Sequence, residues 1–238
     1  GKERCQDALF NGVEVKQVKL HKARRIVAEP NTEGKLRLAV ADGAYHSPAP
    51  HLASYFWMDA FVQDGRANSV FLRKNFWQFC DVLDEYRGSA TTFAAVEIDV
   101  NGDCSLCNVG DSRVYHIHSQ GLWEQMSHDH TLLAEMIACG EAEEGKEYAA
   151  IYSDLAECLI ADPEEAHFKV HAAAFGLDVG DAVLLCTDGL SDALSHTALE
   201  TLWRARTDLQ EKLEDLRQAV RKTPMHDDLS IVCMRRVA

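Results

Sequence analysis

The sequence is short of positive charge. It contains 24 Lys and Arg against 38 Asp and Glu, which gives its 238 residues a formal net charge of −14. Nucleic acids and anionic membrane surfaces would on average be repelled by such a chain, so neither is expected as its main partner. The excess of carboxylates is, by contrast, sufficient to hold cations.

Other absences narrow the class of protein. No apolar run is long enough to cross a membrane, the first residues lack the apolar core of a signal peptide, and no internal repeat or low-complexity segment is visible. We therefore expect a cytoplasmic protein without membrane insertion. With 47% hydrophobic residues, the length suits a single domain over residues 1–238 with a substantial core.

The eight cysteines do not form the spaced framework of a small disulfide-rich protein. Several lie inside apolar runs, among them Cys80 and Cys186, and are predicted to be reduced core residues. Cys104 and Cys107 form a CxxC motif that resembles half of a zinc site. Because residues three apart in a strand point to opposite faces, a metal or redox role is the weaker interpretation.

Strand patterns dominate the chain. Asn101-Gly102 separates two such patterns and predicts a hairpin. Alternation and short apolar runs predict strands over residues 8–18, 21–29, 35–41, 91–100, 104–109, 113–118, 122–123, 168–174, 182–186 and 229–235.

Two helical pairs are expected between the strands. The first pair covers residues 47–61, starting at Ser47-Pro48, and residues 68–86. Ser195 caps the first helix of the second pair, and Thr207 with Gln210 opens the next. Four aromatic residues of the first pair are assigned to the core: Phe71, Phe76, Trp77 and Phe79.

The remaining segments complete the predicted architecture. Residues 131–138 form a short helix that ends before Gly140, and the acidic stretch 141–163 is a surface loop or flap. Strand-rich segments separated by helical pairs suit an α+β fold in which two antiparallel sheets pack face to face. The helical pairs then lie outside, which makes a four-layer αββα sandwich.

Short acidic turns follow or precede several of these strands. They are Asp42-Gly43, Gly110-Asp111, Asp188-Gly189 with Asp192, and Asp227-Asp228. Each alone is ordinary turn chemistry. If the strands lie side by side, however, Asp42, Asp188 and Asp227 gather in one acidic pit, which would repel itself unless it held a cation. Carboxylate ligands favour hard divalent ions such as Mg²⁺ or Mn²⁺.

The order of the motifs carries a family resemblance. They are Gln6-Asp7, Ala41-Asp42-Gly43, Gly88-Ser89-Ala90-Thr91-Thr92, Asn108-Val109-Gly110-Asp111-Ser112-Arg113, Asp129-His130, Thr187-Asp188-Gly189-Leu190-Ser191-Asp192 and Asp227-Asp228-Leu229-Ser230. This series resembles the metal-dependent type 2C serine/threonine protein phosphatases (the PPM family) in their compact bacterial form. The resemblance spans nearly the whole chain.

The resemblance implies an αββα sandwich with two Mn²⁺ or Mg²⁺ ions at one end of the sheets. By position, Asp42 would bridge both ions and the Gly43 carbonyl would bind one of them. Asp188 and Asp227 would hold the other ion, which makes these two residues and Asp42 the catalytic set. Asp7 would support the site through metal-bound water.

Further positions follow from the same resemblance. Asp111 and Asp192 match the acids that hold a third, weaker metal ion in some members, and Arg4 is the candidate phosphate-binding residue. A hydroxide bridging two ions roughly 3.5–4 Å apart would attack phosphorus in line, without a nucleophilic side chain. The implied substrate is a phosphoserine or phosphothreonine protein. The implied setting is bacterial signalling opposite a Ser/Thr kinase, of which type VI secretion regulation is one example, and a monomer is expected.

Several positions depart from the family pattern. Gln6 stands where members usually carry Glu and brings no charge. Arg4 lies unusually close to Asp7, so Arg24 or Arg25 is an alternative phosphate ligand. His46 is a candidate general acid, with metal-bound water as the alternative. Asp228 is the rival of Asp227 as a metal ligand.

Structural interpretations stand beside the functional ones. Asp111 is either a metal ligand or the ion-pair partner of Arg113, and Asp192 is either a ligand or a helix cap. His128 and His130 are assigned structural roles. Two competing functions stay open: a weakly active pseudo-phosphatase that binds a phosphoprotein or kinase as a regulatory module, and a phosphomonoesterase acting on small molecules.

Overall fold

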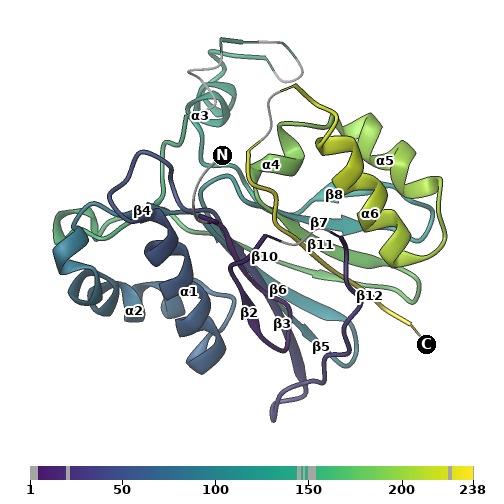
Figure 1. Ribbon diagram of the computed structural model, residues 1–238, viewed down its shortest axis with the longest axis horizontal. Coiled ribbons are helices and arrows are strands. Elements are labelled where there is room, and N and C mark those ends of the chain that lie inside the picture. Colours follow the sequence, from purple (N-terminus) through teal and green to yellow (C-terminus); the bar gives the residue numbers. More distant parts are fainter. Residues whose placement is uncertain are drawn as a thin grey trace.

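The computed structural model describes residues 5–19, 22–143, 146, 148–149, 154–224 and 227–237. Within this range the chain forms four layers (Figure 1). Helices α1 (Pro50–Asp64) and α2 (Ser69–Val82) cover one sheet, and α5 (His196–Arg204) and α6 (Leu209–Val220) cover the other. The predicted α+β sandwich of two antiparallel sheets is confirmed.

The two sheets differ in size. The larger has the order β10-β6-β5-β3-β1-β2, and the smaller has the order β12-β11-β7-β8. All pairings between neighbours are antiparallel. The strands of the larger sheet are β1 (Ala8–Phe10), β2 (Val15–Lys16), β3 (Lys35–Ala41), β5 (Phe93–Asp99), β6 (Asp103–Val109) and β10 (His171–Gly176). Those of the smaller sheet are β7 (Arg113–Ile117), β8 (Trp123–Gln125), β11 (Ala182–Cys186) and β12 (Ile231–Arg235).

Shorter elements complete the chain. Strands β4 (Ala90–Thr91) and β9 (Leu159–Ile160) pair with each other apart from the main sheets. Helix α3 (Leu132–Ala138) stands above the sandwich in Figure 1, and α4 (Asp188–Ser191) directly follows β11. Two 3₁₀ turns are η1 (Asp84–Tyr86) and η3 (Pro163–Glu165).

Strand β11 shows how the layers are built. Val183 and Leu185 point into the core between the two sheets, whereas Leu184 points to the other face and packs with Trp203 and Leu216 beneath α5 and α6. Because both faces are covered, every residue of the strand is buried. This accounts for its continuous apolar sequence and for the agreement between its predicted and observed bounds.

The cysteines follow the prediction. All eight are free thiols. Cys104 lies in the core between the sheets and Cys107 in the core beneath α1 and α2, on opposite faces of β6. The CxxC motif therefore cannot bind one metal ion with both sulfur atoms.

Four predictions of local structure were wrong. The single strand predicted over residues 8–18 is a hairpin, in which β1 and β2 pair antiparallel. No strand forms among the described residues of the segment 22–29, because its backbone at Ala23 hydrogen-bonds to Gln210 and Glu214 of α6 instead of to another strand. Helix α1 begins at Pro50, with Ala49 before it, not at Ser47-Pro48. Trp77 is 57% exposed, so it does not belong to the core with its neighbours.

The predicted helix caps agree better with the structure. Ser195 caps α5 as predicted, since its Oγ accepts a hydrogen bond from the amide of Ala198. Helix α6 is capped by Asp208, one residue after the predicted Thr207. In the part of the chain that the structure describes, no helix combines the length and hydropathy of a membrane span.

Candidate metal centre

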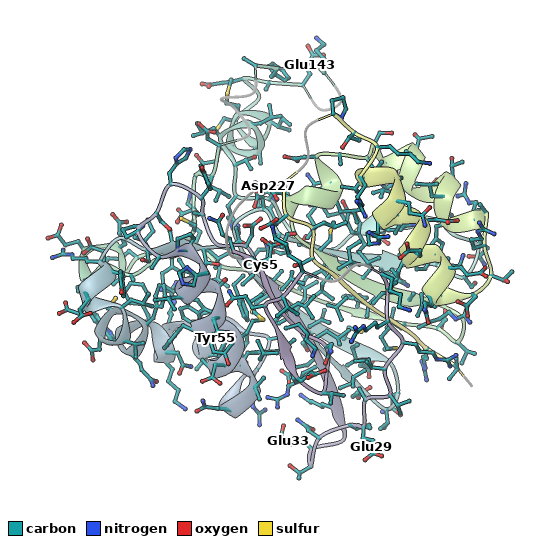
Figure 2. All side chains as sticks on the ribbon, in the orientation of Figure 1. Cys5, Glu29, Glu33, Tyr55, Glu143 and Asp227 are labelled. Carbon is teal, nitrogen blue, oxygen red and sulfur yellow. The ribbon has the colours of Figure 1, made fainter. Side chains whose placement is uncertain are left out.

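The strand register gathers the acidic turns at one end of the sandwich. In the larger sheet, the start of β1 lies opposite the end of β3, with Ala8 paired to Ala41. In the smaller sheet, Cys186 at the end of β11 pairs with both Arg113 and Ile231 at the starts of β7 and β12. The acids next to these ends are Asp7, Asp42, Asp111, Asp188, Asp227 and Asp228, which we call the acidic centre together with Asp192. Figure 2 shows Asp227 and Cys5 at this end and Glu29 and Glu33 at the other.

Two glycines let the backbone close in around the acids. A Cβ atom on Gly43 would lie 2.4 Å from the carbonyl oxygen of Pro50, at the start of α1. A Cβ atom on Gly189 would lie 2.2 Å from the carbonyl oxygen of Asp228. The glycine after each of Asp42 and Asp188 is therefore required by packing, which explains the repeated Asp-Gly pattern of the sequence.

Asp7 is the most deeply buried acid, with 1% of its surface exposed. The hydroxyl of Thr187 donates to its Oδ2 over 2.9 Å, and that hydroxyl accepts from the amide of Ser230 over 3.0 Å. Among the described residues its Oδ1 has no hydrogen-bond partner. Burial and the charges of Asp228 and Asp188 raise the pKa of Asp7 from its ordinary value to about 7.

Asp42 is fixed through its backbone. Its amide donates to the Oγ1 of Thr92 over 3.0 Å, and its carbonyl oxygen accepts from the Oγ1 of Thr91 over 2.7 Å. Burial, the charges of Asp7 and Asp188, and a hydrogen bond with Asp188 raise the pKa of Asp42 well above its ordinary value. The Asp42 and Asp188 carboxylates thus meet across the two sheets.

Asp111 and Asp192 belong to the same electrostatic network. Burial raises the pKa of Asp111 to about 8, with contributions from the charges of Asp188 and Asp192. Burial and the charge of Asp188 also raise the pKa of Asp192, which follows the last turn of α4 and is exposed. Arg113 does not pair with Asp111. Its guanidinium binds Asp129, with nitrogen–oxygen distances of 2.5 to 3.1 Å, so the ion-pair interpretation of Asp111 was wrong.

The two acids before β12 take different positions. Asp227 is exposed, and its Oδ1 accepts a hydrogen bond from the amide of Asp228 over 2.6 Å. The negative charge of Asp227 contributes to the raised pKa of Asp192. Asp228 is half-buried, and its charge contributes to the raised pKa of Asp7. Its Oδ2 atom has no hydrogen-bond partner in the described ranges. Both therefore face the acidic centre, and Asp227 as the ligand of the pair stays a prediction.

The remaining candidate site residues do not all lie at the acidic centre. Arg4 lies outside the described residues. Gln6 has a buried Oε1 atom for which the described part of the chain supplies no donor, so its amide is available to the site. His46 is exposed and packs edge-on against Tyr45, with ring centroids 5.0 Å apart. Arg24 and Arg25, the alternative phosphate ligands, follow the Ala23 backbone that packs on α6, away from the acidic centre.

The ring of His130 holds the backbone near the site, as predicted. The ring Nδ1 of His130 lies 3.2 Å from both the amide and the carbonyl oxygen of Gly110. Asn108 exchanges hydrogen bonds with the backbone of His128, at 2.7 and 3.2 Å. These contacts fix the turn that carries Asp111.

The donor set suits divalent cations. Buried and half-buried carboxylates raise one another's pKa, which means that their charged forms are destabilised when only protein surrounds them. Buried acceptor atoms of Gln6 and Asp7 point to the same need for a positive partner. Because the donors are oxygen atoms, Mg²⁺ and Mn²⁺ fit the acidic centre better than metals that prefer sulfur.

These pKa shifts predict how pH affects the metal-free protein. The folded-state pKa values of Asp7 and Asp111, about 7 and about 8, lie above the unfolded value of 3.8. Their protonated forms favour the fold. The stability that these two acids contribute is therefore fully present below pH 4 and is lost as pH rises toward 8. In EDTA we expect the melting temperature to fall from pH 5 to pH 8. Asp111→Asn should flatten this slope; a slope that is unchanged in the variant would contradict the assignment.

The supporting hydroxyl groups were missed by the sequence analysis. Thr91, Thr92, Thr187 and Ser230 stand inside the motifs but received no role, although their hydroxyls or amides hold Asp42 and Asp7 in place. The available signal was their position directly beside an acidic residue at a strand end. Which acid each hydroxyl serves depends on contacts between strands far apart in the sequence.

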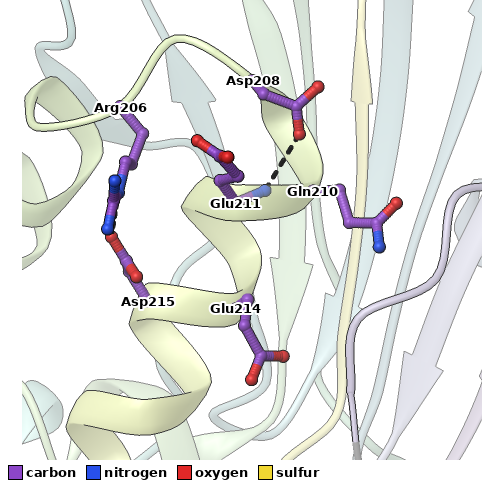
Figure 3. Close-up of a pocket in the computed structure, with 6 residues that line it drawn as sticks. All are labelled: Arg206, Asp208, Gln210, Glu211, Glu214 and Asp215. Carbon is purple, nitrogen blue, oxygen red and sulfur yellow. Dashed lines mark hydrogen bonds and ion pairs between the residues drawn. The ribbon is translucent and has the colours of Figure 1, made fainter.

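A shallow hollow of about 400 Å³ lies elsewhere, at the start of α6 (Figure 3). Three of its four acids have structural partners: Asp208 caps the helix through the amide of Glu211, and Asp215 binds Arg206 over 2.7 Å. Glu214 binds Arg217 and the amide of Ala23. The hollow is therefore a surface feature of the helix and not the candidate site.

Comparisons with known proteins agree with this geometry. The family model described as Stage II sporulation protein E (SpoIIE) matches residues 32–237. The serine/threonine phosphatase stp of Listeria welshimeri is 27% identical over 152 residues, which cover 64% of this chain and 59% of the relative. The chain thus matches about three fifths of that relative's length.

Solved structures share the fold. The S. agalactiae serine/threonine phosphatase superposes with a TM-score of 0.76 at 20% identity, over 100% of this chain and 95% of the other. The catalytic domain of the serine threonine protein phosphatase PstP, solved with two manganese ions, gives a TM-score of 0.67 at 19% identity, over 95% and 98% of the two chains. Since the family model covers nearly the whole described sandwich, the chain belongs to the SpoIIE/type 2C phosphatase family.

Proposed function

We propose that this protein is a metal-dependent phosphatase that hydrolyses phosphoserine and phosphothreonine in proteins. The observation that carries the proposal is the acidic centre, in which carboxylates from both sheets meet and raise one another's pKa. Family membership supports it, and the Listeria relative and the structural neighbours are named as serine/threonine phosphatases.

The proposed roles follow the positions of the residues. Asp42 and the carbonyl group of Gly43, with Asp188 and Asp227, would hold two divalent cations, either Mn²⁺ or Mg²⁺. The proposed supporting groups are Asp7 and Gln6 for hydrating water, Asp111 and Asp192 for a third cation, Asp228 as the rival of Asp227, and Arg4 for the phosphoryl oxygens. When bound, the cations supply a water of lowered pKa and neutralise charge that develops on the phosphoryl group.

The protein's own groups prepare this chemistry. Thr91 and Thr92 fix the backbone of Asp42. Thr187 holds Oδ2 of Asp7, and Oδ1 has no hydrogen-bond partner among the described residues. Cys5 is not a competing nucleophile. Burial and the charge of Asp7 raise the pKa of its thiol to about 11, so it stays protonated at neutral pH. Water is therefore the nucleophile that the site supports.

The wider setting stays a set of predictions. These are a single catalytic domain over residues 1–238, a monomer in the cytoplasm, and a bacterial phosphoprotein substrate opposite a Ser/Thr kinase. The acidic stretch 141–163, of which Glu143 lies above the acidic centre in Figure 2, is the proposed determinant of substrate choice. His46 as general acid is also untested. The pseudo-phosphatase alternative has no support among the relatives and structural neighbours, whose names are those of serine/threonine phosphatases.

Hydrolysis assays test the proposal. We expect the purified protein to release phosphate from phosphoserine and phosphothreonine peptides and from p-nitrophenyl phosphate in Mn²⁺, and to lose this activity in EDTA. Restoring Mn²⁺ should restore turnover. Absence of metal-dependent turnover on every substrate would contradict the proposal, and turnover of small phosphomonoesters without phosphopeptides would favour the small-molecule alternative.

A further inference from the structure

A second group of metal-binding side chains lies at the other end of the sandwich. His116 pairs with Glu124 across β7 and β8, and His118 follows two residues later on the same face of the chain. One ligand atom from each of these three residues lies within 4.8 Å of the others. Arg113, beside the acidic centre, is five residues before His118, a span of roughly 17 Å along an extended strand. The group is therefore separate from the acidic centre.

The three side chains differ in exposure. The side chain of His116 is 8% exposed, whereas those of His118 and Glu124 are 37% and 60% exposed. His116 is held by ring contacts on two sides, with the His118 ring centroid 4.1 Å away and the Phe175 ring stacked at 5.5 Å. The group thus has one fixed member and two members that can adjust, and solvent reaches it.

A buried carboxylate fixes the ring of His116. The Nε2 atom of His116 lies 2.8 Å from Oδ2 of Asp181, whose side chain is 5% exposed. Burial opposes ionisation of this acid, but the hydrogen bonds from His116 and from the amides of Ser119 and Asp178 hold the pKa of Asp181 below its ordinary value. A carboxylate that binds one ring nitrogen leaves the other as a ligand. This is the usual arrangement behind metal-binding histidines.

We propose that His116, His118 and Glu124 bind a Zn²⁺ ion, with Asp181 positioning the ring of His116. Two imidazoles and one carboxylate suit Zn²⁺, whereas Mg²⁺ prefers oxygen ligands alone. Tetrahedral bonds of about 2.0–2.1 Å place ligand atoms about 3.4 Å apart. His118 Nε2 and Glu124 Oε2 are already 3.5 Å apart, and one ligand atom from each of the three residues lies within 4.8 Å of the others. A bound ion would cross-link β7 and β8 at the edge of the smaller sheet.

Zinc titration tests the proposal without relying on phosphatase activity. The full chain is stripped with EDTA, supplied with excess Mg²⁺ to fill the acidic centre, and titrated with Zn²⁺ by calorimetry. We expect a site that His118→Ala and Glu124→Gln each weaken at least about tenfold, and that Asp181→Asn weakens by about tenfold to hundredfold. Zinc should also shift the imidazole NMR signals of His116 and His118.

A matched control is available on α5. His196 lies 3.6 Å from Glu200 in another surface histidine–glutamate pair, which is not part of the three-residue group. His196→Ala should leave the zinc site unchanged. Equal zinc affinity in the wild type and His118→Ala, or an equal loss in His196→Ala, would overturn the proposal. Because the readout is binding, a failed phosphatase assay would leave this result unaffected.

Discussion

Replacing Asp188 with asparagine is expected to reduce metal-dependent phosphate release by roughly a hundredfold or more. The substitution keeps the size of the side chain but removes the charge that meets Asp42 across the two sheets. A bound cation contributes several kcal/mol to the transition state, and each 1.4 kcal/mol corresponds to a factor of ten in rate. The measurement is steady-state hydrolysis of a phosphopeptide in Mn²⁺, together with calorimetric Mn²⁺ binding.

The same variant should not be less stable than the wild type without metal. Asp188 raises the pKa of Asp7, Asp42 and Asp111, so a neutral amide relieves repulsion among buried acids. We expect an equal or higher melting temperature in EDTA. Ser195→Ala, which removes a cap of α5 outside the acidic centre, is the control for activity and should retain normal turnover. A fully active Asp188→Asn protein would refute the site assignment.

Replacing Trp57 with alanine is expected to lower the free energy of unfolding by about 3–5 kcal/mol. Trp57 is fully buried on α1 and has ring contacts with Phe71, Phe79 and Phe93 at 5.3 to 6.1 Å. These contacts join both helices of the pair to the larger sheet. Urea unfolding monitored by circular dichroism gives the free energy.

Trp77→Ala is the matched control for this variant. Trp77 lies on α2 and is 57% exposed, so its removal should change the unfolding free energy by no more than about 0.5 kcal/mol. Trp57→Phe should be milder than Trp57→Ala because it keeps a ring and removes an indole nitrogen that has no hydrogen-bond partner within the described ranges. Equal losses for Trp57→Ala and Trp77→Ala would show that the helix pair is not anchored through Trp57.

The fold could be predicted where one pattern decided the structure locally. The alternation over Lys35–Ala41 and the apolar run over Ala182–Cys186 gave both strands their observed bounds. The strand predicted over residues 21–29 was wrong because apolar residues alone do not supply a pairing partner. Ile26 and Val27 are 42% and 85% exposed. Strand pairing is a property of the whole fold, and a short sequence window does not contain it.

The acidic centre was predictable as a set, because the acids follow or precede recognisable strands and antiparallel strands bring those ends together. The individual contacts within it could not be predicted from the sequence. Arg113 could be assigned to Asp111 by proximity in sequence, but the fold gives it Asp129. The group of His116, His118 and Glu124 needed the register between β7 and β8, which fixes which residues of a hairpin face each other.

The division of the acids between the two sheets has a consequence for folding. Asp7 and Asp42 adjoin strands of the larger sheet, while Asp188 and Asp227 adjoin strands of the smaller one. A folding intermediate with only one sheet formed would offer half of the ligands and little affinity for the ions. Metal would then bind after the sheets have docked, and it would retard unfolding without accelerating folding. A bound metal ion would thus slow the separation of the two sheets.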